Sequence, residues 1–182
     1  MPCRAVLPVA LVLAPLPALA VLDEDEPPPG PTPTTTVCAD GHVRDAEKGR
    51  CVAPEESRLP DDALLRAARE LAHAGRHDEA IRVVLAMAGP EGEMALTLLG
   101  FVHRKAGRTA PGMAPCDRAI RAIARKPDNL LARSYKGMEH VEAGGPDLAR
   151  AGLAEIESRG GAGRWPDEAP SAALRAGAGL AC

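Results

Sequence analysis

The chain has 182 residues, of which 46% are hydrophobic and 26% are charged, a balance typical of a globular domain with additional segments. Its formal net charge of −3, from 22 basic and 25 acidic residues, argues against nucleic-acid binding, which requires a basic surface. Only 2% of the residues are aromatic, so the core is expected to consist of Ala, Leu, Val and Ile.

The first 20 residues, MPCRAVLPVALVLAPLPALA, have the pattern of a secretory signal peptide. Arg4 precedes an apolar run, and residues 18–20 form a small-x-small cleavage pattern. A transmembrane anchor is the alternative, but the apolar run is short and contains three prolines. We therefore expect cleavage after Ala20, a periplasmic or secreted protein, and no membrane insertion after cleavage.

The segment over 21–37 is acidic at its start and then rich in Pro and Thr. Four consecutive acids, Asp23–Glu26, are followed by PPPGPTPTTT, a composition that cannot bury a core. The sequence therefore predicts a disordered linker over 21–37.

A small loop closed by cysteines is predicted over 38–54. Removal of the signal peptide leaves Cys38, Cys51, Cys116 and Cys182, which can pair in three ways in an oxidising compartment. We favour Cys38 with Cys51 because the intervening loop is short and contains turn residues. A metal site formed by Cys38, His42 and Cys51 is the alternative, although the sequence has no paired C-x-x-C.

The residues from Leu59 onward have helical periodicity. Leu64, Ala67, Ala68 and Leu71 lie on one face of a predicted helix, Gly75 ends that helix, and a second apolar stripe follows over 80–88. This pattern predicts a helical hairpin with a tight glycine turn.

The hairpin pattern occurs three times. Turn glycines at 75, 107 and 144 are separated by 32 and 37 residues, close to the 34-residue tetratricopeptide period. A small residue lies seven positions before each glycine (Ala68, Gly100, Gly137) and five positions after it (Ala80, Gly112, Ala149). Apolar residues follow nine and twelve positions after each glycine, and KPDN (126–129) resembles an inter-repeat turn.

On these residues the chain resembles the tetratricopeptide-repeat (TPR) family over 61–159, with hairpins at about 61–92, 93–129 and 130–159. An Ala-rich helical bundle without true repeats is the alternative. The sequence departs from the family in having few aromatic packing residues, with His103 and His140 at positions that are usually apolar or aromatic. These departures put the packing density of the repeats in doubt.

The second unit contains Pro111 and Pro115 between two helical patterns. We interpret it as two helices with a lengthened turn: a first helix to about Lys105, a loop near 108–114, and a helix near 115–125. After the third unit, the segment 160–182 is expected to cap the array, with Trp165-Pro166 folding back and a short helix over 171–176.

The resemblance implies a concave groove that binds another protein. In the family, the first helix of each hairpin lines this groove, which corresponds here to Arg69, His73, Thr97, Phe101, Arg104, Lys105, Ser134, Met138 and Glu142. Phe101 is either an exposed apolar anchor or a packing residue between helices. Family members that grip a C-terminal carboxylate use groove asparagines, which are absent here, so that ligand is disfavoured.

No strong catalytic, phosphate-binding or metal-binding motif is present. His73 and His77 flank the Gly75 turn and need not share a face, and Cys116 lies on an apolar helical stripe, typical of a core residue. We therefore expect an all-α protein, a short solenoid of about three TPR-like hairpins, acting as a non-catalytic scaffold or adaptor without cofactor or metal. The alternative is a small metal- or redox-responsive envelope protein that uses His103/His140 or Cys116/Cys182.

Overall fold

The computed structural model describes residues 28–108 and 115–176, so the predicted signal peptide, most of the predicted loop near 108–114 and the last six residues lie outside it. The described elements, in chain order, are α1 (Pro33–Thr36), β1 (Val43–Asp45), β2 (Arg50–Val52), the 3-10 turn η1 (Pro54–Glu56), α2 (Asp61–His73), α3 (His77–Leu85), α4 (Glu93–Lys105), α5 (Pro115–Arg125), α6 (Leu130–Glu142), α7 (Pro146–Ile156), the π-helical turn η2 (Glu157–Gly161) and α8 (Trp165–Arg175).

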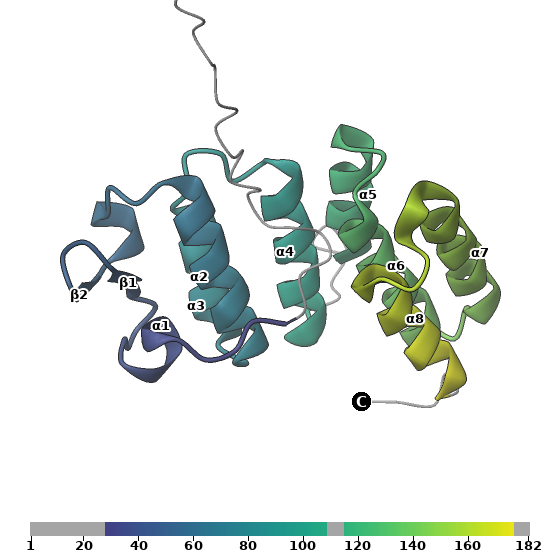
Figure 1. Ribbon diagram of the computed structural model, residues 1–182, viewed down its shortest axis with the longest axis horizontal. Helices are drawn as coiled ribbons and strands as arrows, with labels where there is room; N and C mark the ends of the chain where they lie inside the picture. The colour runs from purple at the N-terminus through teal and green to yellow at the C-terminus, as the bar shows by residue number, and fades with distance from the viewer. Residues whose placement is uncertain (1–27, 109–114, 177–182) are drawn as a thin grey trace, which may run out of the picture.

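Within the described residues, the helices from α2 to α7 pair into three successive hairpins, α2–α3, α4–α5 and α6–α7. Figure 1 shows these hairpins following one another along the long axis, with the two-stranded sheet at one end and α8 beside α6 at the other. The predicted all-α array of hairpins is therefore confirmed. The helix expected near 115–125 is α5, and the helix before it ends at Lys105 as expected.

The first helix of each hairpin ends in the same way. Gly75, Gly107 and Gly144 have φ angles of 78°, 67° and 75°, in the left-handed region that glycine adopts without steric cost. The residue after each glycine donates its backbone N–H to a carbonyl five residues earlier, at 2.9, 2.9 and 2.8 Å. This is the Schellman motif, which satisfies the free carbonyls at a helix C-terminus.

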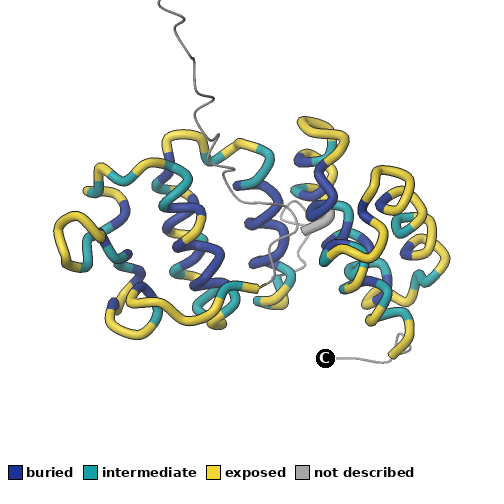
Figure 2. Tube along the Cα trace, viewed as in Figure 1, coloured by how far each residue is buried: buried dark blue, intermediate teal, exposed yellow. Residues whose placement is uncertain are grey.

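The core lies between the hairpins. Leu71, Val83, Val84 and Val102 are fully buried, and they belong to a cluster that joins α2, α3, α4 and α6. Figure 2 shows that buried positions gather within the helices and that exposed residues lie mainly at the turns. The aliphatic core expected from the composition is thus present, although Phe101 and Tyr135 also belong to it.

A loop closed by the predicted Cys38–Cys51 disulfide covers the N-terminal end of the array. The two Cα atoms are 5.7 Å apart, and β1 pairs antiparallel with β2, placing Arg44 opposite Cys51. Because both sulfurs are in this bond, the alternative metal site with His42 is wrong.

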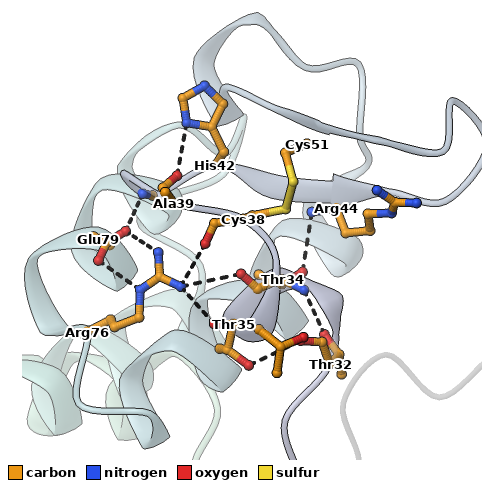
Figure 3. The surroundings of a disulfide bond; sticks show 12 residues. Thr32, Thr34, Thr35, Cys38, Ala39, His42, Arg44, Cys51, Arg76 and Glu79 are labelled. Atoms are coloured by element: carbon orange, nitrogen blue, oxygen red, sulfur yellow. Dashed lines mark hydrogen bonds and ion pairs between the residues drawn. A yellow bond between two sulfur atoms is a disulfide. The ribbon is translucent and has the colours of Figure 1, made fainter.

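Two arginines of the first hairpin hold this loop. Arg76 donates to the carbonyl of Cys38 at 3.0 Å and pairs with Glu79 (Figure 3). The carboxylate of Glu79 also accepts the N–H of Gly41. Arg82 donates to the carbonyl of Asp40 at 2.8 Å. The loop is therefore fixed to α3 by charge-assisted hydrogen bonds as well as by its own closure.

The linker expected over 21–37 ends earlier than predicted. Residues 33–36 form α1, whose first turn contains Pro33 and whose N-cap is the hydroxyl of Thr32, an acceptor from Thr34 N–H. The buried carboxylate of Glu70 in α2 accepts bonds from Thr32 N–H at 2.7 Å and Thr35 Oγ1 at 2.6 Å. Contacts with α2 therefore order the segment around α1. The composition of the linker does not indicate these contacts.

The C-terminal helix is also longer than the short helix expected over 171–176. It begins at Trp165 with Pro166 in its first turn, a position that proline favours because no intrahelical donor is needed there. Pro170 is fully buried, and a Cβ at Gly137 of α6 would lie 3.4 Å from it. The small residue at 137 therefore allows α8 to approach α6 closely.

Asn129 links two hairpins through a fully buried side chain. Its Oδ1 caps α6 by accepting from Ala132 N–H at 2.8 Å, and its Nδ2 donates to Thr97 Oγ1 of α4 at 3.1 Å. No other side chain in the described residues both caps the N-terminus of a helix and forms a hydrogen bond to another hairpin.

We expect Asn129→Ala to lower the free energy of unfolding by about 2 kcal/mol, from loss of the cap and of the bond to Thr97. Asn129→Ser, which keeps a capping hydroxyl but cannot span to α4, should lose about half of that. Urea unfolding of both variants measures the difference. Equal losses in the two variants would show that the contact with Thr97 adds nothing.

Candidate binding groove

The inner helices α2, α4 and α6 border a cavity of ≈ 230 Å³ together with α8 and the described N-terminal segment. Five residues predicted to line the groove surround it: His73, Phe101, Arg104, Lys105 and Met138. Pro28, Tyr135, Trp165 and Ala169 complete the wall, and we call this space the groove cavity.

Three other predicted groove residues are not accessible to a partner. Arg69, Thr97 and Ser134 are only 5%, 2% and 0% exposed. Arg69 and Thr97 border a space of ≈ 10 Å³ with Tyr135, because neighbouring inner helices pack against each other over this stretch. The expectation that they present their side chains to a ligand is therefore corrected.

The ninth predicted residue, Glu142, lies at the end of α6 and forms an ion pair with Arg104. Its side chain is exposed, whereas that of Arg104 is almost fully buried. Glu142 thus neutralises part of the charge at the cavity without lining it.

Three rings from three helices form the floor of the groove cavity. The ring of Phe101 lies 4.9 Å from that of His73 and 4.7 Å from that of Tyr135, measured between centroids. Aromatic ring pairs at such centroid distances contribute about 0.5–1.5 kcal/mol each beyond their buried area. Phe101 is 4% exposed, so of the two expectations the packing residue is correct and the exposed anchor is wrong.

The sequence reasoning missed Tyr135, although one compositional signal was available. The chain contains a single Phe, a single Tyr and a single Trp, and all three line the groove cavity. In a chain so poor in aromatics, their meeting at one place requires long-range contacts between α4, α6 and α8. Periodicity along a single helix cannot show this.

Two cations stand at the groove cavity. The guanidinium carbon of Arg104 lies 5.7 Å from the centroid of Phe101, within cation–π range. Its Nε is buried and has no hydrogen-bond partner among the described residues. Lys105 is exposed at the rim and makes no ion pair with another described residue.

The two titratable rings of the floor are uncharged at neutral pH. Burial, together with the nearby charges of Arg69 and Lys105, lowers the pKa of His73 to about 4. Burial also raises the pKa of Tyr135 to about 12. The cavity therefore combines a neutral aromatic floor with a positively charged rim, which favours an apolar segment that carries carboxylates.

The low pKa of His73 predicts a loss of stability in mild acid. The unfolded chain, with an ordinary histidine pKa, binds the proton more readily than the folded protein, so stability falls as pH falls from about 6.5 towards 4. We expect His73→Gln to reduce the loss between pH 7 and pH 5 by about 1 kcal/mol, a value that allows for solvent screening of the half-buried ring. Urea unfolding at both pH values measures it.

Part of the loss should persist in His73→Gln, because burial also lowers the pKa of His103. His77→Gln provides the matched control, since His77 lies across the turn at the start of α3. If the control and His73→Gln show the same pH dependence, His73 is not the group responsible.

The remaining sequence candidates do not form a second site in the described residues. His140 lines a separate cavity of ≈ 240 Å³ with Arg133 and Lys136, whereas His103 is buried near Arg118 and Arg108. Cys182 lies outside the described residues. The described part of the chain contains no group of three or more His, Cys, Asp or Glu side chains placed to hold a metal ion.

None of the described helices is both long enough and apolar enough to cross a membrane. No protein-family model, curated protein or solved structure matches this chain, so a functional interpretation rests on its own residues.

Proposed function

We propose that this protein is a non-catalytic adaptor that binds an extended segment of another protein in the groove cavity. The observation that carries the proposal is the cavity itself, where an aromatic floor formed by three hairpins meets two cations of α4. A segment bound there contacts α2, α4, α6 and α8 at once, so its affinity depends on the whole array rather than on one helix.

The chemistry of the lining defines the class of ligand. The rings of the floor and the side chain of Met138 favour apolar side chains. The Nε of Arg104, which has no partner in the described part of the chain, and the ammonium of Lys105 favour carboxylates. We therefore propose a partner segment that contains both apolar and acidic residues. The resemblance to TPR proteins, which bind extended peptides on their concave side, supports the same reading.

The cellular location is part of the proposal. The signal-like first 20 residues and the Cys38–Cys51 disulfide both support an exported protein in an oxidising compartment such as the periplasm. The partner would then be another envelope or secreted protein.

Site-specific photo-crosslinking in intact cells tests this function. A photoreactive amino acid at Lys105, on the cavity rim, should enrich one partner that the same group at Lys48, in the exposed turn of the disulfide loop, does not. Arg104→Glu should abolish the crosslink at position 105. Arg150→Glu makes the same charge change on the outer helix α7 and should leave it intact. Equal enrichment at both positions, or equal effects of the two variants, would contradict the groove as the binding site.

A further inference from the structure

The described N-terminal segment leads from a fixed anchor into the groove cavity. At the anchor, Thr32 N–H and Oγ1 donate to the two carboxylate oxygens of Glu70 at 2.7 and 2.6 Å. Glu70 lies on α2, one turn before His73 of the cavity floor. The chain from Thr32 back towards the N-terminus therefore begins next to the cavity.

The anchor is itself held in place by the disulfide loop. Arg76 donates to the carbonyls of Thr34 and Thr35 at 3.4 Å as well as to that of Cys38 (Figure 3). Four residues before Thr32, Pro28 lines the cavity beside Phe101, Lys105 and Trp165. In Figure 1 the dark purple trace correspondingly runs from α1 towards α4.

The residues that precede Pro28 in the chain carry a charge opposite to that of the cavity. Asp23–Glu26, which lie outside the described residues, supply four consecutive carboxylates that begin two residues before Pro28. At about 3.5 Å per residue, the whole run lies within roughly 18 Å of Pro28. Lys105 of the rim and Arg104 of the cavity wall are therefore within reach of these carboxylates, and the short tether gives a high effective concentration.

We propose that the acidic run Asp23–Glu26 of this chain occupies the groove cavity in the free protein and competes with the partner segment. The competition rests on the proposed function, whereas the occupancy follows from the anchor, the position of Pro28 and the charges. The arm formed by residues 21–30 thus regulates access to the binding site.

The single tryptophan reports directly on occupancy, because Trp165 lines the groove cavity. Neutralising the arm with D23N, E24Q, D25N and E26Q should increase quenching of Trp165 fluorescence by acrylamide about two-fold, since an unseated arm no longer shields the ring. Acrylamide is uncharged, so the change reports shielding rather than attraction of the quencher. Unchanged quenching would overturn the proposal.

A matched variant controls for net charge. E47Q, E56Q, D117N and E157Q remove the same four charges from exposed positions without an ion pair to a described residue, and should leave quenching unchanged. Lys105→Glu, which changes the rim instead of the arm, should increase quenching as the arm variant does. Circular dichroism shows whether all variants keep their helices. Quenching that depends on protein concentration would mean that the arm of a second copy is bound, which also overturns the proposal.

A synthetic peptide of residues 21–30 separates this inference from the proposed function. It should bind the arm-neutralised variant about ten-fold more tightly than the original protein, whose tethered arm competes with it. Equal binding to both proteins would overturn the inference and leave the adaptor function standing. Absence of binding to the arm-neutralised variant, whose cavity is open, would instead count against the adaptor function.

Discussion

Phe101→Ala is expected to lower the free energy of unfolding by about 4 kcal/mol, the range found for deletion of a buried phenylalanine ring. The ring is 4% exposed and lies between those of His73 and Tyr135, so truncation removes two ring contacts as well as apolar burial. Since whole domains are stable by about 5–15 kcal/mol, the variant should be close to unfolding. Urea or thermal unfolding measures the loss.

Phe101→Leu distinguishes the ring contacts from simple burial. Leucine keeps most of the apolar volume, so we expect a loss of about 1–1.5 kcal/mol and a folded protein. In this variant the pKa of His73 should rise from about 4 towards 6.5, because water reaches the imidazole where the ring was. An NMR titration of His73 measures this change.

A loss of stability below about 1 kcal/mol in Phe101→Ala would show that the ring is not packed as described.

Replacing the disulfide by Cys38→Ser with Cys51→Ser is expected to cost about 3 kcal/mol, the value for closure of a loop of this size. Stability in an array of hairpins depends mainly on contacts between neighbours, so the loss should be concentrated at the N-terminal end. Hydrogen exchange should become faster in α1, α2 and α3 while α6 and α7 keep their protection.

A reducing agent provides the control for the disulfide. It should destabilise the original protein by a similar amount and leave the serine variant unchanged. Uniformly faster exchange through all three hairpins would show instead that the array unfolds as one unit. Because Arg76 joins the disulfide loop to α1, the serine variant should also increase acrylamide quenching of Trp165 if the arm is released.

The parts of the fold that depend on residues close together in the sequence could be predicted. The ends of α2, α4 and α6 follow from Gly75, Gly107 and Gly144, because a left-handed residue ends a helix wherever it occurs. The Cys38–Cys51 pairing follows from a short loop with turn residues. The start of α5 follows from Pro115, because the first turn of a helix is a position that proline favours.

Predictions of exposure were less reliable, because exposure depends on what packs against a helix. Thr97 and Ser134 lie at the positions expected to face a groove, yet they are buried where α4 and α6 meet. Asn129 was not singled out, because its role depends on Thr97, which is 32 residues away. A helical pattern indicates which side of a helix is apolar but not how closely the next hairpin approaches that side.

The sequence by itself determined the helices of the three hairpins, their glycine turns, the disulfide and the order of the hairpins, because these depend on backbone preferences and on residues a few positions apart. Only the tertiary structure decided that the single Phe, Tyr and Trp meet in one cavity, that the buried Nε of Arg104 has no partner there among the described residues, and that the segment before α1 leads to it. These features join residues from α2, α4, α6 and α8 with the N-terminal segment. Their placement depends on the packing of whole hairpins, which no local pattern encodes.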